Sequence, residues 1–252
     1  MEQVLEVDGR LDVLINNAAA NFPVPAEDMS PNAWRTVVDI TLNGTYSKQQ
    51  AVYQGDRKFS QEALAAADFS PGGSFTNPVV WQDFADVEVI RVGEVYYMTA
   101  STMHYSPGAP ILRSYDLVNW EFVSYAMPDF PPGAEYRLED GRDLYGQGIW
   151  APSLRFHDGR FHIFANINQR GLHVFTAIDP AGPWTHSRID RNLHDLSVLF
   201  DDDGRVYAVF NYNEVRLVEL KADLSGVVEG SERVIIPAGN GMGEGHHFYK
   251  VD

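Results

Sequence analysis

Three stretches of the chain share a pattern that restricts the fold more than any other feature of the sequence. VIRVGEVYYMTAST, LRFHDGRFHIFAN and LFDDDGRVYAVFN each contain a strand, a tight turn at a glycine and a second strand rich in aromatic residues. The turn glycines are Gly93, Gly159 and Gly204, at intervals of 66 and 45 residues. The repetition predicts three copies of one antiparallel unit.

A second turn recurs after each of these hairpins. Asp116 in SYDLVNW, Asp179 in AIDPAGPW and Asp223 in KADLSGV follow the three glycines by 23, 20 and 19 residues, where a third strand would join a fourth. Four antiparallel strands repeated in series are typical of β-propeller blades. The extra length of the first interval falls in MPDFPPGAEYRLEDGRDLYG. The sequence thus predicts an all-β, partial propeller of about three blades.

The first part of the chain has a different texture. LDVLINNAA resembles a short buried strand, and SPNAWRTVVDITLNGTYSKQQAVY follows it with a helix start and apolar residues at roughly helical spacing. Pro, Gly and Ser residues in FSPGGSFTNP then indicate a boundary near residue 68. We therefore expect a small α/β segment over residues 1–67 and a propeller domain over 68–252.

Composition excludes several classes of partner and chemistry. The net charge of −16 would repel nucleic acid and anionic membrane surfaces but not neutral sugars. Because the chain has no cysteine, disulfides, thiolate zinc sites and thiol nucleophiles are excluded. The first 20 residues carry acids where a signal peptide needs basic residues, and no apolar run reaches the length of a membrane span. As written, the sequence predicts a soluble, cytoplasmic protein, and it leaves the oligomeric state open.

Acidic residues recur near the starts of the predicted first strands. Asp86 lies 7 residues before Gly93, and Asp195 lies 9 before Gly204. Nine residues after Glu244 would be position 253, so Glu244 stands where a fourth first strand should begin. First strands line the central channel of a propeller, so these three side chains are expected to converge there.

Converging carboxyl groups suit the hydrolysis of glycosidic bonds. That reaction needs one protonated acid for the leaving oxygen and one carboxylate that activates water, and crowded like charges separate the pKa values of such groups. The alternative for any single aspartate is a turn or solvated residue. No metal is expected, because His246-His247 lacks the spacing of a zinc motif and DDDG at 201–204 lacks the rest of a calcium loop.

Several motifs together resemble glycoside hydrolase family 43. They are WQDFADVEVIRVGEVYYMTASTMHYSPGAPILRSYDLVNWE, GIWAPSLRFHDGRFHIF, DPAGPW, HDLSVLFDDDGRVY and GEGHHFYK, collinear from about residue 75 onward. The resemblance implies a five-bladed propeller that cleaves with inversion, as a β-xylosidase, α-L-arabinofuranosidase or arabinanase. It implies that Asp86 is the general base, that Glu244 is the general acid, and that Asp195 keeps this acid protonated and oriented.

The same resemblance suggests further site residues. His104, Trp150 and His247 sit in the matching motifs and are expected to shape a sugar pocket. Packing between blades is an equal alternative for Trp150, and His104 could be a hydrogen-bonded structural residue. The sequence departs from the family at Val87 and Leu196, where proline is usual. An inverting mechanism predicts carboxyl groups of Asp86 and Glu244 roughly 6.5–9.5 Å apart.

The N-terminal part resembles the middle of a short-chain dehydrogenase/reductase, of the 2,4-dienoyl-CoA reductase kind, over residues 9–46. Asn16-Asn17-Ala18-Ala19 matches the NNAG motif of that family. The glycine-rich turn that would seat a pyrophosphate is missing, and no Tyr is followed four residues later by Lys. We therefore expect no nicotinamide cofactor, and we interpret the segment as a remnant of a gene fusion or a faulty gene model.

Two functions remain open from the sequence. The first is an inverting glycosidase on xylose- or arabinose-containing glycans, and the second is a non-catalytic or carbohydrate-binding fragment of a propeller. Because a ring of three blades is unclosed, we expect little activity from the chain alone, a poorly supported strand after Glu244 and a loosely attached N-terminal segment.

Overall fold

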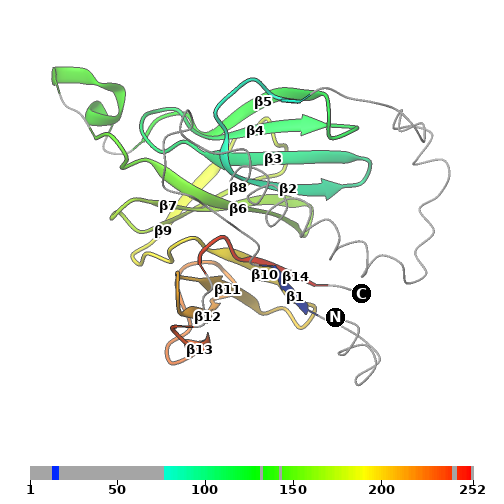
Figure 1. Cartoon of the computed structure of the whole chain (residues 1–252), viewed down its shortest axis with the longest axis vertical. Helices are drawn as coiled ribbons and strands as arrows, with labels where there is room; N and C mark the ends of the chain where they lie inside the picture. The colour runs from blue at the N-terminus through cyan, green and yellow to red at the C-terminus, as the bar shows by residue number, and fades with distance from the viewer. Residues whose placement is uncertain (1–12, 17–76, 131–132, 142–143, 240–242, 251–252) are drawn as a thin grey trace, which may run out of the picture.

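The computed structural model describes residues 13–16, 77–130, 133–141, 144–239 and 243–250 (Figure 1). Three four-stranded antiparallel sheets account for most of them, and in each sheet the strands follow their order in the sequence. The first sheet contains β2 (Ala85–Val92), β3 (Val95–Ser101), β4 (Gly108–Ser114) and β5 (Trp120–Met127). The second contains β6 (Ile149–His157), β7 (Arg160–Ile167), β8 (Leu172–Ala177) and β9 (Thr185–Ile189). The third contains β10 (Ser197–Phe200), β11 (Val206–Phe210), β12 (Val215–Leu220) and β13 (Arg233–Ile236).

Both kinds of predicted turn are present in all three sheets, so the predicted partial propeller is confirmed. Gly93, Gly159 and Gly204 join first to second strands with φ of 61°, 71° and 82°, a backbone conformation that glycine adopts without steric cost. The repeated aspartates lie in the turns between third and fourth strands. Their carboxylates accept hydrogen bonds from backbone N–H groups of the same turn. Asp116 Oδ1, for example, accepts from Val118 and Asn119 at 2.9 and 2.7 Å.

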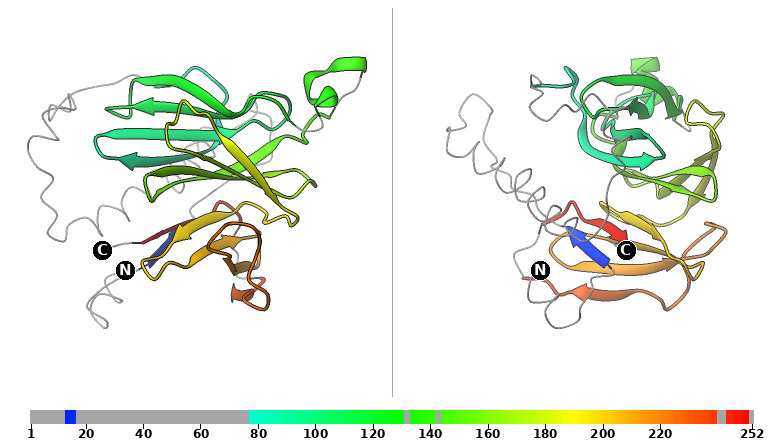
Figure 2. Two further views of the ribbon diagram at one scale, coloured as in Figure 1. Left: turned by 180° about the vertical axis from the view of Figure 1, so that it is seen from behind. Right: turned by 90° about the vertical axis from the view of Figure 1, so that its right-hand side faces the viewer.

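Apolar side chains between neighbouring sheets form the core. Fully buried residues of β4, β6 and β7, such as Ile111, Leu154 and Ile163, fill the space between the first and second sheets. Phe164, Leu172 and Val198 belong to the corresponding cluster between the second and third. The sheets therefore stack face to face, as the views in Figure 2 show. The long connection at 128–148 carries two short 3₁₀ helices, η3 (Ala134–Arg137) and η4 (Glu139–Gly141).

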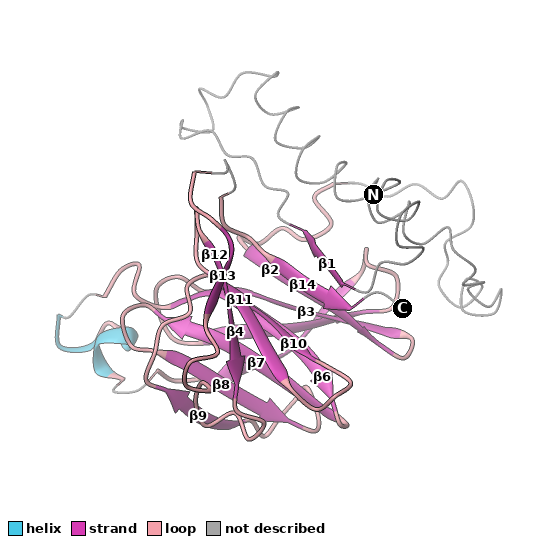
Figure 3. Cartoon of the chain, turned by 90° about the horizontal axis from the view of Figure 1, so that it is seen from below, coloured by secondary structure: helices cyan, strands magenta, loops and turns pink. Residues whose placement is uncertain are grey.

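The first strands of successive sheets are linked by backbone-to-serine hydrogen bonds. Val198 N on β10 donates to Ser153 Oγ on β6 at 3.2 Å. Phe248 N donates to Ser197 Oγ on β10 at 2.9 Å, which adds β14 (His247–Lys250) to the series. The first strands therefore lie side by side, and Figure 3 shows this arrangement from below.

The expected poor support of the strand after Glu244 is wrong. β14 pairs antiparallel with β1 (Val13–Asn16), with Leu14 opposite Tyr249 and Ile15 opposite Phe248. Phe248 is buried in the third apolar cluster, against residues of β11 and β12. Backbone pairing and apolar burial thus hold this strand.

The expected N-terminal strand is present as β1, and its pairing with β14 corrects the expectation that this part of the segment is loosely attached. The expected helix after it and the boundary near residue 68 lie outside the described residues. Within the part of the chain that is described, no helix has the length and apolarity to cross a membrane.

Candidate active site

The first strands and the connections before them surround a cavity of about 760 Å³. Five of the six predicted site residues line it: Asp86, Trp150, Asp195, Glu244 and His247. His104 is not among the described residues that line the cavity.

A left-handed residue precedes each channel-lining strand segment. Asp86, Ala151 and Asp195 have φ of 49°, 39° and 50°, and Gly245 has 84°. These four residues stand two positions before Glu88, Ser153, Ser197 and His247, respectively. For a residue with a side chain this conformation costs roughly 1–2 kcal/mol, and such strain is found preferentially at functional sites. Sequence periodicity contains no signal for it.

Asp86 is held by a serine of the same sheet. Ser101 Oγ donates to Asp86 Oδ2 at 2.6 Å and accepts the N–H of Ala151 at 2.7 Å. Because Ser101 is buried and spends its one proton on the carboxylate, it orients Asp86 and ties that residue to the second sheet. Ser101 has no local sequence signal for this role, because its partners are 15 and 50 residues away.

Asp195 contacts the segment that carries Glu244. Its Oδ2 accepts the N–H of Gly245, the residue directly after Glu244. Burial raises the pKa of Asp195, and the charges of Glu244 and Asp86 add to this rise, while the Gly245 hydrogen bond and the charge of His194 oppose it. The three predicted acids are therefore coupled within one cavity.

Glu244 has a partner 50 residues earlier in the sequence. His194 Nε2 lies 2.7 Å from Glu244 Oε2, and His194 lines the same cavity. Both side chains are more than half exposed, so a leaving group or solvent can reach them. The only sequence signal was the position of His194 directly before Asp195.

Trp150 and His104 both form hydrogen bonds with the backbone of Gly146. Trp150 is 39% exposed, lines the cavity and donates its Nε1–H to Gly146 O at 3.1 Å. His104 Nδ1 accepts the N–H of Gly146 at 3.0 Å, and its ring stacks on Tyr145 with centroids 3.9 Å apart. His104 thus contacts the same loop as Trp150 without lining the cavity.

His247 belongs to an ionic network in the wall of the cavity. Arg155 Nη1 donates to Glu88 Oε1 at 2.6 Å, Tyr249 OH donates to the same oxygen at 3.1 Å, and His247 Nδ1 lies 3.6 Å from it. Burial alone would raise the pKa of Glu88, but the charge of Arg155 and the contacts with His247 outweigh it and hold the pKa at about 2. Burial lowers the pKa of His247, and its hydrogen bond to Glu88 and the charge of Glu88 more than offset this, so the pKa is raised.

Arg155 connects several first strands. Besides Glu88 on β2, it donates to Ser197 Oγ at 2.7 Å and to Val198 O, both on β10. A charged residue amid the apolar positions of LRFHDGRFHIF was a signal for such a network. Across the described residues, no group of three or more His, Asp or Glu side chains is arranged to hold a metal ion.

A partial propeller with three coupled acids in its channel has the arrangement that the hydrolysis of glycosidic bonds requires. The chain matches Glycosyl hydrolases family 43 over residues 75–252, and it belongs to this family. The five-bladed propeller that the sequence resemblance implied is the fold of that family.

Two curated relatives and one solved structure illustrate the similarity. The chain is 32% identical to a beta-xylosidase of Formosa agariphila over 199 residues, covering 71% of the chain and 33% of the relative. It is 32% identical to a non-reducing end alpha-L-arabinofuranosidase of Bacteroides ovatus over 187 residues, covering 71% and 34%. A bifunctional protein of this family from Bacteroides eggerthii superposes with a TM-score of 0.64 at 40% identity, over 70% of the chain and 24% of that structure. The chain thus spans about a third of the length of these curated relatives.

The N-terminal part matches the short chain dehydrogenase family over residues 1–59, in agreement with the second resemblance. The domain boundary near residue 68 falls between the two matched segments and stays a prediction.

Proposed function

We propose that the chain carries the catalytic acids of an inverting, exo-acting glycoside hydrolase for xylose- or arabinose-containing glycans. The observation that carries the proposal is the convergence of Asp86, Asp195 and Glu244 on one cavity, with Asp195 electrostatically coupled to the other two. The relatives that are named beta-xylosidase and alpha-L-arabinofuranosidase support this substrate class.

In this mechanism a water molecule attacks the anomeric carbon on the face opposite the leaving group. Asp86 takes a proton from the water, and Glu244 gives its proton to the departing glycosidic oxygen, so one C–O bond forms as the other breaks. The new hydroxyl has the opposite anomeric configuration. Afterwards Asp86 is protonated and Glu244 ionised, and exchange with solvent restores both.

The neighbouring groups have separate roles in this proposal. Ser101 orients the Asp86 carboxylate, and Asp195 holds the backbone beside Glu244 through the N–H of Gly245. Trp150 offers an exposed ring on which a pentose can stack.

The test is release of 4-nitrophenol from aryl β-xylosides and aryl α-L-arabinofuranosides. Proton NMR of the first product, read before mutarotation, distinguishes inversion from retention. A first product with retained configuration would contradict the mechanism.

The second candidate is a non-catalytic, carbohydrate-binding fragment. It is favoured by one observation, the exposed Trp150 ring at the cavity, on which a sugar can stack without being hydrolysed. Binding of xylo-oligosaccharides without hydrolysis of any aryl glycoside, in the chain and in a form extended to five blades, would favour this candidate.

A further inference from the structure

A second groove, of about 540 Å³, adjoins the central cavity and belongs to none of the catalytic roles above. It is lined by the β7–β8 turn at 169–171, by His173 and His186, and by residues 188 and 190–192; we call it the arginine groove. Gln169 and Asn192 line both the arginine groove and the central cavity, so the two spaces are neighbours. A branched glycan in the central cavity can therefore extend a substituent into this groove.

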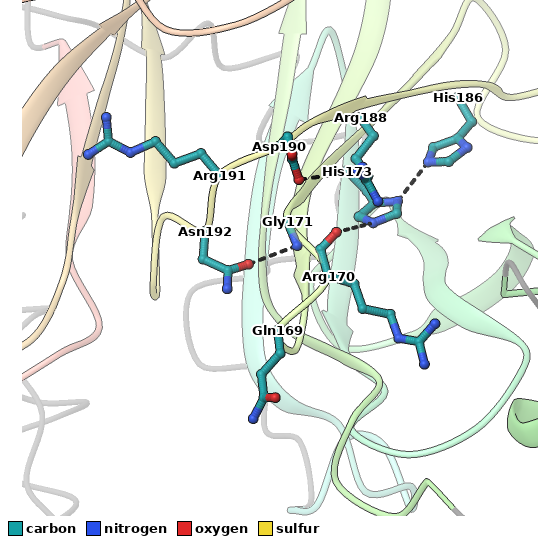
Figure 4. Close-up of a pocket in the computed structure, with 9 residues that line it drawn as sticks. All are labelled: Gln169, Arg170, Gly171, His173, His186, Arg188, Asp190, Arg191 and Asn192. Atoms are coloured by element: carbon teal, nitrogen blue, oxygen red, sulfur yellow. Dashed lines mark hydrogen bonds and ion pairs between the residues drawn. The ribbon is translucent and has the colours of Figure 1, made fainter.

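Three arginine side chains distinguish the groove within a chain whose net charge is −16. Arg170, Arg188 and Arg191 line it together with a single carboxylate, that of Asp190. In Figure 4, Arg170 and Arg191 lie on opposite sides of the contact between Gly171 N and Asn192 Oδ1, which measures 2.9 Å. Each of these arginines pairs with one carboxylate, that of Glu135, Asp190 or Glu232, so the groove offers clustered guanidinium N–H donors rather than a net positive charge.

Arg170 and Arg191 are oriented by carboxylates outside the groove, whereas Arg188 Nη2 donates to Asp190 within it at 3.2 Å. Arg170 Nη2 donates to Glu135 at 3.3 Å, and its guanidinium lies over the Tyr136 ring at 5.4 Å. Arg191 Nη2 donates to Glu232 on the neighbouring sheet. A guanidinium has five N–H donors, and these contacts use one nitrogen of each.

The wall of the groove is uncharged at neutral pH. His173 Nδ1 and His186 Nε2 are 2.7 Å apart, and the two rings stack with centroids 4.9 Å apart. Burial lowers the pKa of His173 to about 4 and also lowers that of His186, so both rings are neutral and only the guanidinium groups supply positive charge. Flat rings and the amides of Gln169 and Asn192 are the groups that contact sugar rings and hydroxyls.

We propose that the arginine groove binds the carboxylate of a uronic acid residue carried as a branch on the glycan. Guanidinium groups recognise planar carboxylates with paired hydrogen bonds, and the groove has the volume of an ordinary ligand pocket. This inference rests on the proposed function, because it assumes that the neighbouring cavity holds a glycan.

The experiment compares two probes by titration calorimetry on the 252-residue chain: methyl β-D-glucuronide and methyl β-D-glucoside. They differ at C6, where one has a carboxylate and the other a hydroxymethyl group. We expect the glucuronide to bind at least about tenfold more tightly, and added NaCl to weaken it, because the difference is electrostatic. Equal affinity for both probes would overturn the inference.

Variants locate the binding. Arg188→Gln and Arg170→Gln should each raise the Kd for the glucuronide about tenfold, as expected for one lost charged hydrogen bond. Arg113→Gln is the matched control, because Arg113 on β4 is also exposed and paired, at 2.8 Å from Glu121, but lies outside the groove. If an arginine variant misfolds by circular dichroism, Gln169→Glu replaces it, since an added carboxylate at this exposed position should repel the probe. Unchanged affinity in folded groove variants would refute the site.

Two further titrations separate the possible sources of a result. Sodium sulfate that binds as tightly as the glucuronide would show a general anion site and overturn the assignment to a sugar acid. Binding of xylotriose, which has no carboxylate, measures occupancy of the central cavity. Trp150→Ala should weaken this binding, because Trp150 lines that cavity and not the groove. If the parent chain binds xylotriose but not the glucuronide, only the assignment of the groove is refuted. If it binds the glucuronide but not xylotriose, only the proposed function is refuted.

Discussion

His194 and Glu244 meet at the central cavity, with Nε2 of the imidazole 2.7 Å from Oε2 of the carboxyl group. Asp195, the next residue after His194, accepts the N–H of Gly245, the next residue after Glu244. Two consecutive residues thus hold two consecutive residues of a segment 50 positions later. One contact orients the side chain of Glu244, and the other orients its backbone.

Replacing the two acids should separate their roles. In a chain that carries all five blades, Asp86→Asn and Glu244→Gln should each lower turnover by at least about 10²-fold, the contribution of a general base or acid. An aryl leaving group that needs little protonation should partly rescue Glu244→Gln and leave Asp86→Asn slow. The measurement is kcat on aryl and disaccharide substrates, and parent-like activity of both variants would refute the assignment.

His194→Ala should act through Glu244. We expect kcat on a disaccharide to fall between about 10- and 100-fold, the range for a misplaced catalytic group, with KM nearly unchanged. Hydrolysis of an activated aryl glycoside should fall much less, because that leaving group depends little on the acid. His194→Gln keeps a polar group of similar reach and should recover part of the loss. A uniform rise of KM on all substrates would instead indicate a role in binding.

The Glu88–Arg155 pair should dominate stability at acid pH. Its carboxylate has a pKa of about 2 in the folded chain against 4.5 as the ordinary value, a difference of about 3 kcal/mol. Because the pKa is depressed, this contribution is complete above pH of about 4.5 and is lost as pH falls toward 2.

Glu88→Gln should therefore lower the free energy of unfolding at pH 7 by about 3–5 kcal/mol, as for other broken buried pairs, and should flatten its decline in acid. Urea titrations between pH 7 and pH 3 measure both effects. The control is Glu94→Gln, which removes the exposed ion pair with Arg91. Similar acid profiles for parent and Glu88→Gln would contradict the role of this pair.

Gly148 should tolerate no side chain at the junction of the first two sheets. A Cβ atom there would collide with the carbonyl oxygen of Thr102 and lie 2.8 Å from His104 N, and both are backbone atoms that cannot rotate away. Gly148 N also donates to Met103 O at 2.8 Å, so the approach is enforced by a hydrogen bond.

We expect Gly148→Ala to lower stability by about 1–3 kcal/mol, the cost of overpacking, as measured by the midpoint of thermal unfolding. Gly226→Ala is the control, since its nearest contact is 3.7 Å away, with the flexible Lys221 side chain. Equal midpoints for the two variants would show that the junction can relax.

The repeated hairpins and turns could be predicted because each depends on a few adjacent residues. Gly93, Gly159 and Gly204 supply a left-handed conformation locally, and the recurrent aspartates close their turns on N–H groups two or three residues away. The positions of Asp86, Asp195 and Glu244 followed from the same repeats, because in a propeller equivalent residues of successive blades share the channel.

Contacts between distant segments were decided by the tertiary structure alone. Nothing near Glu244 in the sequence indicates His194, and nothing near Arg155 indicates Glu88, 67 residues earlier. The pairing of β14 with β1 was likewise unforeseen, because an unpaired strand edge accepts any segment that supplies matching N–H and C=O groups. By itself the sequence thus determined the blades, their turns and the acids that face the channel, since these follow from local conformation and repetition. The partners that orient those acids, and the charges of the neighbouring groove, depend on which side chains the stacked sheets bring together.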